Sequence, residues 1–330
     1  MRSSLATSLA AVAAFALLTA VPAAAHDGRG HGDPRPDRPT TYLLDPSGPA
    51  ADDIYPEGVA VRGDDFYVSS TTDGTIYRGD LDEPTATPFL PGGQDGRTMA
   101  VGIKVDGRTL LVAGGSTGRV WAYDLRTREL TGSWQAAQDG TPVFVNDLAV
   151  SPRGDVYVTD SLSPVLYRID ARERRTTGTE VLEPFVSFEG TEFEYTDSFN
   201  ANGIAISRDG RYAVVAQTST STLFRIGLTD RSVEAIDLGG ELVQGDGLLL
   251  EGRRLLAVEW QGDVSSIVAV DLDRGYASGT VVSRTSDPSF DDPTTIARAG
   301  RSLLVVNSQF GTRETGGTPG PFTVSRIPAP

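Results

Sequence analysis

Six positions in the sequence, 44 to 56 residues apart, carry a set of side chains suited to holding a metal ion. Each stands just before a short apolar segment in one of six similar stretches; they are Glu57, Val101, Asn146, Asn202, Asp246 and Thr294. Carboxylate and carboxamide oxygens suit a hard cation, and two carboxylates balance one divalent ion. Calcium accepts about six to eight ligands, so four protein oxygens leave room for water or substrate, whereas magnesium demands stricter octahedral geometry.

Asparagine and aspartate are also common where a loop enters a strand, because their side chains cap backbone groups. Turn chemistry explains one such residue easily, but four oxygen donors at equivalent positions favour a metal site. Asp147 directly follows Asn146. Two roles are open for it: orienting that carboxamide beside the metal, or hydrogen bonding to a neighbouring repeat.

The six stretches share a plan of short strands, and these strands must position the candidate ligands. Each has an apolar strand, a Gly-containing turn, a second strand, a polar loop and a third strand, as in VNDLAVSPRGDVYVTDSLSPVLYRID from Val145. A fourth, outer strand is expected after each of the first five stretches, at 86–90, 129–134, 180–185, 233–238 and 280–283. Residues 40–44, ahead of the first stretch, supply the strand that the sixth lacks.

This repeat predicts an all-β fold, a six-bladed β-propeller with four strands per blade and the N-terminal strand closing the last blade. Closure removes the sheet edges that invite aggregation, and no amphipathic helix is expected. The inner strands of a propeller run side by side along the central channel in one direction. The six aligned residues therefore form a ring at one mouth of the channel, which we call the mouth ring.

Composition narrows the classes of function. The chain has 330 residues, a formal net charge of −15 and no cysteine. Its acidic balance argues against nucleic acid or an anionic membrane as partner, and the lack of cysteine excludes thiol nucleophiles and thiolate metal sites. Both histidines, His26 and His31, precede the repeats. Histidine-based triads and histidine-ligated zinc, copper or iron are therefore excluded from the folded body.

The N-terminal residues resemble a targeting segment. Residues 1–25 combine Arg2, an apolar run and a small-residue end, which is typical of a secretory signal peptide cleaved after Ala25. Residues 26–39 are rich in Gly, Pro and charge, so a disordered leader is expected there. We therefore expect a secreted protein in which residues 40–330 form a single propeller domain, and nothing in the sequence implies an oligomer.

The order and spacing of the short motifs resemble the superfamily of senescence marker protein (regucalcin), gluconolactonase, diisopropylfluorophosphatase and paraoxonase. The matching pieces are P-E-G at Glu57, N-D at Asn146 and Asp147, N-G-I-A-I-S at Asn202, and D-G at Asp246. The resemblance implies a calcium-dependent hydrolase of lactones or phosphotriesters, with Glu57, Asn202 and Asp246 as ligands and Asn146 as a ligand or a substrate contact. The histidines near the pocket of paraoxonase-like members are missing, which favours the gluconolactonase-like version.

In this hypothesis calcium, or another divalent ion, polarises a carbonyl or phosphoryl oxygen. Asp246 then activates water as a base or attacks the substrate directly. Two long loops, 187–201 and 307–321, are expected to shape the pocket for a lactone or ester, with plain surface insertions as the alternative. Four aromatic residues near the loop ends are candidates for an apolar mouth or for packing between blades: Phe144, Phe199, Trp260 and Phe310.

Two other functions fit the same sequence. One is a non-catalytic propeller with structural calcium that binds a protein or a small ligand, which the missing histidines and the apolar Val101 favour. The other is a different chemistry on the same scaffold, such as a strictosidine-synthase-like condensation, against which the four-donor ring argues. Turnover that a chelator abolishes would favour the hydrolase, and stabilisation by calcium without turnover would favour the binding module.

Overall fold

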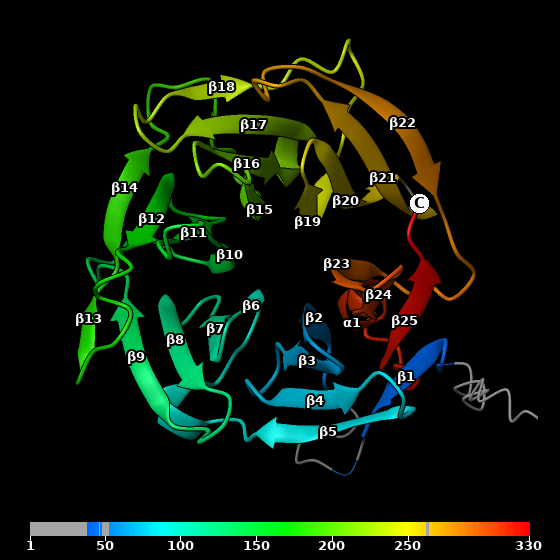
Figure 1. Cartoon of the computed structure of the whole chain (residues 1–330). Helices are drawn as coiled ribbons and strands as arrows, with labels where there is room; N and C mark the ends of the chain where they lie inside the picture. The colour runs from blue at the N-terminus through cyan, green and yellow to red at the C-terminus, as the bar shows by residue number, and fades with distance from the viewer. Residues whose placement is uncertain (1–37, 46, 48–52, 262–263) are drawn as a thin grey trace, which may run out of the picture. The chain divides into compact units, whose positions relative to one another are not determined.

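The computed structural model describes residues 38–45, 47, 53–261 and 264–330. The predicted signal peptide, most of the predicted leader, His26 and His31 lie outside the described residues. The unit from Arg38 to Pro330 consists of β-sheets that follow one another around a common centre (Figure 1). Within the ranges that the structure describes, no helix is long and apolar enough to cross a membrane.

Six antiparallel blades make up this unit, which confirms the predicted propeller. The inner strands are β2 (Pro56–Arg62), β6 (Ile103–Asp106), β10 (Val145–Val150), β15 (Ala201–Ile206), β19 (Gly245–Glu251) and β23 (Pro293–Ala299). The second strands are β3 (Asp65–Ser70), β7 (Thr109–Ala113), β11 (Val156–Asp160), β16 (Tyr212–Gln217), β20 (Arg254–Gln261) and β24 (Ser302–Asn307).

The third and outer strands complete the blades. The third strands are β4 (Ile76–Asp80), β8 (Arg119–Asp124), β12 (Val165–Ile169), β17 (Thr222–Gly227), β21 (Val264–Leu272) and β25 (Thr323–Pro328). The outer strands are β5 (Thr85–Leu90), β9 (Leu130–Gln135), β14 (Glu183–Ser187), β18 (Val233–Ala235), β22 (Gly279–Thr285) and, in blade six, β1 (Thr41–Leu44).

The N-terminal strand closes the ring of blades as predicted. β1 pairs antiparallel with β25, with Tyr42 opposite Val324, and it also pairs parallel with β5 of blade one. Blades six and one therefore share one continuous eight-stranded sheet. The Tyr42 ring is fully buried, and its hydroxyl donates to Leu81 O at 2.9 Å. This strand thus joins the two ends of the propeller through both backbone and side chain.

The predicted outer strand at 180–185 is wrong, because the chain breaks there into two strands. Thr179–Val181 (β13) pairs parallel with β9 as a fifth strand of blade two, whereas β14 pairs with β12 and completes blade three. Leu182 lies between them, buried, with its N–H donating to Gln135 O at 2.8 Å. Only Leu182 separates the two short strands, and no Gly- or Asn-containing turn marks the break, so the sequence pattern predicts a single strand.

The apolar core lies between the blades. Successive inner-strand residues face opposite neighbours: Val59 packs with the cluster shared by blades six and one, and Ala60 with the cluster shared by blades one and two. This arrangement follows from the period of two along a strand. It buries both faces of every blade and fixes the inner strands next to one another.

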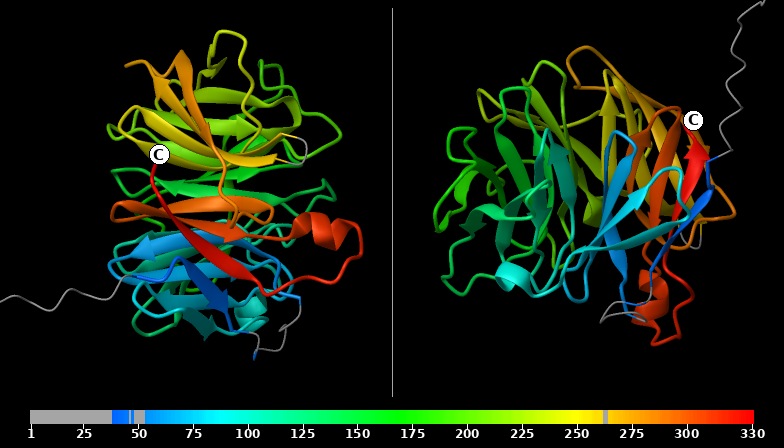
Figure 2. Two further views of the ribbon diagram at one scale, coloured as in Figure 1. Left: turned by 90° about the vertical axis from the view of Figure 1, so that its right-hand side faces the viewer. Right: turned by 60° about the horizontal axis from the view of Figure 1, so that its bottom comes forward.

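One short helix departs from the prediction that no helix is present. Phe310–Glu314 (α1) lies in the loop between β24 and β25, after Gln309 with a φ of 57°. In the side views of Figure 2 it projects beyond the ends of these strands. A five-residue helix is too short to leave a helical hydrophobic period in the sequence. Because inner strands begin at the end where second strands finish, α1 lies at the same end as the mouth ring.

Candidate functional site

In five blades the mouth-ring residue is the second residue of the inner strand and lies within a β-bulge, whereas Val101 of blade two stands two residues before β6. In five blades the register between inner and second strand shifts across the ring residue and its successor, as between Val145 and Leu148 in blade three. In blade two, Val101 N–H donates to Ala113 O, and Ala113 N–H donates to Gly102 O. The bulge places two residues opposite one and reorients the ring side chain relative to the regular pleat.

The bulges bring each ring residue against the next blade around the whole circle. A Cβ at Gly203 would lie 1.9 Å from Asp246 O, and one at Gly58 would lie 2.5 Å from Val101 O. Only glycine permits such close backbone approach. Between blades six and one, Thr294 Oγ1 donates to Glu57 O at 2.8 Å. The backbones of the ring residues therefore contact one another from blade to blade, and these contacts fix the positions from which the ring side chains extend.

Hydroxyl groups fix the orientation of both ring carboxamides. Asn146 Nδ2 donates to Ser161 Oγ at 2.8 Å, and Asn202 Nδ2 donates to Thr218 Oγ1 at 3.1 Å. Ser161 donates its own proton to Ala201 O, and Thr218 donates to Gly245 O. A hydroxyl whose proton is used in this way can only accept from the carboxamide, so it selects the NH₂ group. Both carbonyl oxygens are thereby left for another partner.

Two buried oxygens of the ring lack a hydrogen-bond partner among the described residues. They are Asn146 Oδ1 and Glu57 Oε2, on side chains that are 4% and 6% exposed. The other oxygen of Glu57 accepts from Thr295 Oγ1 at 3.3 Å. Buried polar atoms are nearly always paired, so two such oxygens in one ring are suited to bind an ion or a water molecule.

The two ring carboxylates are strongly desolvated. Burial raises the pKa of Glu57 well above its ordinary value, and the Asp246 and Asp147 charges raise it further, against Lys104 and the Thr295 hydrogen bond. Burial and the Asp147 charge likewise raise the pKa of Asp246 to about 8, against a hydrogen bond from Asn202. Among the groups that act on Glu57, the charge of Lys104 does not offset the burial of the carboxyl.

Asp147 bonds to neighbouring blades rather than to the carboxamide of Asn146. Its Oδ1 accepts from Leu148 N at 2.8 Å, its Oδ2 accepts from Ile204 N of blade four at 3.3 Å, and Lys104 Nζ of blade two lies 3.5 Å from Oδ1. Of the two roles left open by the sequence, these contacts match hydrogen bonding to a neighbouring blade. Asp147 nevertheless adds a third negative charge near the ring.

The two remaining ring positions carry neither a carboxylate nor a carboxamide. Val101 is apolar and buried, and the hydroxyl proton of Thr294 is used by Glu57 O. Within the described residues, no three His, Cys, Asp or Glu side chains converge as a metal-binding group. A cation at the mouth would therefore depend on the two carboxamide oxygens as well as on Glu57 and Asp246. These four residues fit a hard cation such as calcium by donor type and by charge.

The candidate aromatic residues separate into two pairs. Phe144 and Phe199 meet edge to face with ring centroids 4.9 Å apart, and Phe199 is 44% exposed. Trp260 Nε1 donates to Pro293 O at 2.9 Å, so it joins blades five and six, and Phe310 packs against the cluster of blades six and one. The first pair therefore leaves Phe199 open to solvent, whereas Trp260 and Phe310 each serve packing between blades.

The loop at 187–201 is held down by its own aromatic residues. Phe188 and Phe193 are each 1% exposed and stack with centroids 4.4 Å apart. Phe193 also packs on Phe224, and Tyr195 donates its hydroxyl proton to Asp160 O at 2.5 Å. This part of the loop belongs to the core between blades three and four, and its end at Phe199 remains open to solvent.

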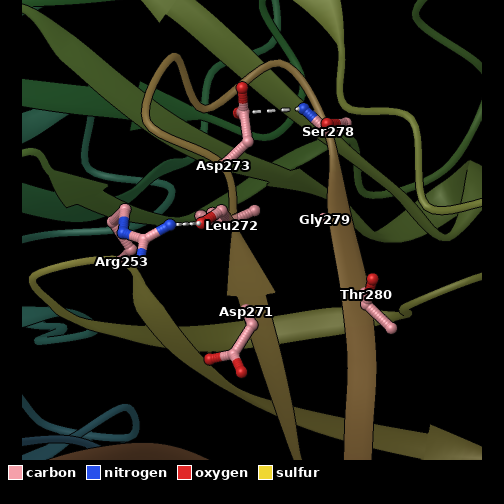
Figure 3. Close-up of a pocket in the computed structure, with 7 residues that line it drawn as sticks. All are labelled: Arg253, Asp271, Leu272, Asp273, Ser278, Gly279 and Thr280. Carbon is pink, nitrogen blue, oxygen red and sulfur yellow. Dashed lines mark hydrogen bonds between the residues drawn. The ribbon is translucent and has the colours of Figure 1, made fainter.

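Two surface cavities lie away from the mouth ring. One, of about 390 Å³, lies by the outer strands of blade five and is drawn in Figure 3; it is lined by Arg253, Asp271, Leu272, Asp273, Ser278, Gly279 and Thr280. The other, of about 430 Å³, lies beside the blade-one loops around Asp73 and Gly92. Neither is lined by a ring residue. In Figure 3 Asp273 and Arg253 bond to backbone atoms, which gives these residues a structural role.

The sequence pattern missed the groups that orient the donors. Ser161 and Thr218 each directly follow a second strand, and Thr71 and Ser308 stand at the equivalent position in blades one and six. A hydroxyl recurring one residue beyond the second strand was a usable signal. Lys104 was also missed, since nothing in the repeat pattern marks it as a partner of Asp147.

Solved structures with the same overall fold were found, whereas no protein-family model and no curated protein sequence matches the chain. The major Malassezia sympodialis allergen Mala s 1 is 12% identical with a TM-score of 0.62, covering 88% of this chain and 96% of its own. Virginiamycin B lyase from Staphylococcus aureus is 11% identical with a TM-score of 0.56, covering 88% and 98%.

A putative 6-phosphogluconolactonase from Bacteroides uniformis is 15% identical with a TM-score of 0.52, covering 75% of this chain and 76% of its own. At these identities the similarity shows the β-propeller fold alone. The propeller is thus shared with proteins named as a lyase, a lactonase and an allergen.

Proposed function

We propose that the mouth ring binds one divalent cation, with calcium as the best match, and that the protein uses it to hydrolyse a lactone or ester. The observation that carries the proposal is the unsatisfied state of the ring: Asn146 Oδ1 and Glu57 Oε2 are buried without partners. Hydroxyl groups hold the carboxamides of Asn146 and Asn202 by their nitrogens, so the two carbonyl oxygens take no part in these bonds. Four residues therefore offer oxygen ligands to a cation that prefers oxygen, as calcium does.

The residues divide into holding and reacting roles. Glu57, Asn146, Asn202 and Asp246 would hold the cation, which when bound supplies a positive charge that polarises a carbonyl oxygen. Asp246 is our choice for the general base, because it is a buried carboxylate of the ring and would stand beside the cation where a water molecule could bind. The proton would move from the attacking water to a carboxylate oxygen of Asp246.

The surroundings suit a small neutral substrate with an apolar part. Phe144 directly precedes Val145 and Asn146 in the chain, and its ring contacts the exposed Phe199. An ester or lactone carbonyl at the ring would leave its hydrocarbon part beside these two rings. The lactonase and lyase names among similar structures are compatible with small-molecule chemistry on this fold.

Hydrolysis of a panel of lactones and aryl esters tests the enzymatic proposal. The full chain is expected to turn over at least one class in calcium, to lose activity in EDTA, and to regain it when calcium is restored. The Asp246→Asn variant should lose most activity. If Asp246→Asn bound calcium normally and kept the full rate, Asp246 would not be the base.

A non-catalytic propeller with a structural cation is the second candidate. It is favoured by the apolar Val101, which leaves blade two without an oxygen ligand in the ring. In that case calcium would raise the melting temperature while no member of the panel is turned over. We also propose export from the cell, on the basis of the signal-like sequence of residues 1–25.

A further inference from the structure

Lys104 is the one lysine of the chain; the other 28 of its 29 Lys and Arg residues are arginines. It stands three residues after Val101, within β6. At the equivalent position the other inner strands carry a small or apolar residue: Ala60, Ala149, Ala205, Leu249 and Ala297. A long cationic side chain at a position otherwise apolar, from the only lysine in the sequence, requires a specific reason.

The side chain of Lys104 extends towards the charges of the mouth ring. It is 24% exposed, and its Nζ lies 3.5 Å from Oδ1 of Asp147, whose side chain is 6% exposed. Its charge also acts on Glu57, where it opposes the rise in the pKa of that carboxyl. Blade two, which contributes the apolar Val101 to the ring, thus contributes a positive charge just below it.

The charges around the mouth balance in a simple way. Glu57, Asp147 and Asp246 are three buried carboxylates within electrostatic reach of one another. When all three are ionised around a bound cation and Lys104 is charged, their sum is two negative charges, which matches one divalent ion. Without Lys104 the sum is three, which a trivalent ion or a second cation would match better. The Coulomb energy scales with the charge of the bound ion, so a nearby ammonium penalises a trivalent ion more than a divalent one.

We propose that Lys104 is a built-in counter-ion that sets the valence selectivity of the mouth ring for a divalent cation. This inference rests on the proposed cation site. Lysine suits the role better than arginine, because its ammonium is a compact point charge, whereas a guanidinium would bind Asp147 in a wide planar fork. The role concerns specificity, so it is separate from the chemistry assigned to Asp246.

Cation binding by calorimetry on the EDTA-treated full chain tests this inference without reference to activity. Wild type, Lys104→Met and Lys104→Arg are each titrated with calcium and with lanthanum. Lys104→Met should bind calcium about tenfold more tightly and lanthanum about thirtyfold more tightly, since the effect grows with ion charge. Lys104→Arg should stay close to wild type. The double variant Lys104→Met/Asp147→Asn, which restores two negative charges, should return the lanthanum-to-calcium ratio to the wild-type value.

The outcomes separate this inference from the proposed site. If wild type binds calcium and Lys104→Met binds both ions as wild type does, Lys104 is not the counter-ion and the site stands. If neither protein binds a cation, the site and the inference both fail. If only Lys104→Met binds, the natural ring is not a cation site, but the control by Lys104 is upheld.

A spectroscopic measurement on the natural sequence guards against a variant that does not fold. Because the chain has one lysine, protein grown on ¹³C-labelled lysine gives a single side-chain Cε signal. Saturation with calcium should shift this signal, since the new charge lies beside the ammonium. An unchanged signal under calcium saturation would overturn the inference.

Discussion

At the residue scale, the hydroxyls of Ser161 and Thr218 decide which atoms the ring presents. Each hydroxyl gives its proton to a carbonyl of the next blade and so accepts from the carboxamide nitrogen. The same hydroxyls that join the blades therefore hold the carboxamide nitrogens of Asn146 and Asn202 and leave their oxygens to other partners. Ser161 and Thr218 therefore contribute both to the contacts between blades three, four and five and to the orientation of the two carboxamides.

The Ser161→Ala variant tests this orientation. It should lose about 1–3 kcal/mol of stability, because Asn146 Nδ2 and Ala201 O lose a buried partner. Calcium should also bind several-fold more weakly, since the carboxamide is free to rotate. Thermal unfolding and calcium titration give the two numbers.

Ser308→Ala is the matched control for this change. Ser308 occupies the same position in blade six and donates to Asp292 O at 2.6 Å, but it holds no ring carboxamide. It should lose comparable stability and keep calcium affinity. Equal weakening of calcium binding in both variants would contradict the orienting role of Ser161.

The buried carboxyls predict how stability depends on pH without calcium. The pKa values of Glu57 and Asp246 are raised in the folded chain, so above the ordinary carboxyl range the native state binds more protons than the unfolded state. Stability in EDTA should therefore fall as the pH rises from about 4, near the unfolded value, to about 8, where Asp246 ionises.

Chemical denaturation at several pH values in EDTA measures this slope. Glu57→Gln should be more stable than wild type at pH values near 8, because it removes a buried charge while keeping the shape. Each unit of pKa shift corresponds to about 1.4 kcal/mol. A wild-type stability that rose over this range, or equalled that of Glu57→Gln, would show that the carboxyls are not desolvated.

The six ring positions were predictable from sequence, because they recur at equivalent positions of a visible repeat, whereas cation binding by four of them stays a prediction. The contacts that surround these residues could not be predicted from the sequence. Whether Asp147 orients Asn146 or bonds to another blade depends on the positions of Ile204 and Lys104. These residues are distant in the sequence, and no periodicity relates them to Asp147.

At the scale of elements, the loop at 187–201 combines an anchored part with an exposed tip. Phe188 and Phe193 are buried in the packing between blades three and four, whereas Phe199 is exposed beside Phe144. The sequence suggested either a binding loop or a surface insertion. Burial of two aromatics shows that much of the segment is core, which leaves its end at Phe199 exposed to solvent.

Two phenylalanine substitutions separate these roles. Phe193→Ala should cost about 3–5 kcal/mol of stability through the cavity it leaves. Phe199→Ala should cost less than about 1 kcal/mol, as exposed positions usually do, and should raise KM for aryl esters. Unfolding curves and steady-state kinetics measure both. An unchanged KM in Phe199→Ala would remove Phe199 from the binding surface.

The strands show where sequence patterns lose resolution. Period-two alternation located every inner strand, but it merged β13 and β14 into one outer strand. Both segments have strand-forming residues, and the choice of partner depends on the edge of blade two being open. The outer edge of blade two forms only when its strands have paired, so a local sequence pattern cannot predict that β13 joins it.

At the scale of the whole molecule, closure depends on β1, which pairs with strands at both ends of the chain's repeat region. The closed ring leaves the inner strands no freedom to separate, and the channel mouth keeps its shape only under that condition. Removal of one contact in the closing strand should therefore weaken the entire fold.

Tyr42→Ala tests this dependence. Tyr42 is fully buried, its ring lies 4.8 Å from that of Phe66, and its hydroxyl donates to Leu81 O. The variant should lose about 3–5 kcal/mol and aggregate on heating. Tyr42→Phe, which loses only the hydroxyl, should lose about 1 kcal/mol. Melting curves with light scattering measure both, and a Tyr42→Ala variant as stable as wild type would mean that β1 is dispensable.

Calorimetric titration of calcium into the EDTA-treated full-length chain, beside Glu57→Gln, is the most direct measurement of the mouth ring. Wild type should bind one ion per chain, and Glu57→Gln should bind at least about a hundredfold more weakly, since a buried charged ligand becomes neutral. Absence of binding by wild type, or equal binding by both proteins, would contradict a cation site at the mouth of the channel.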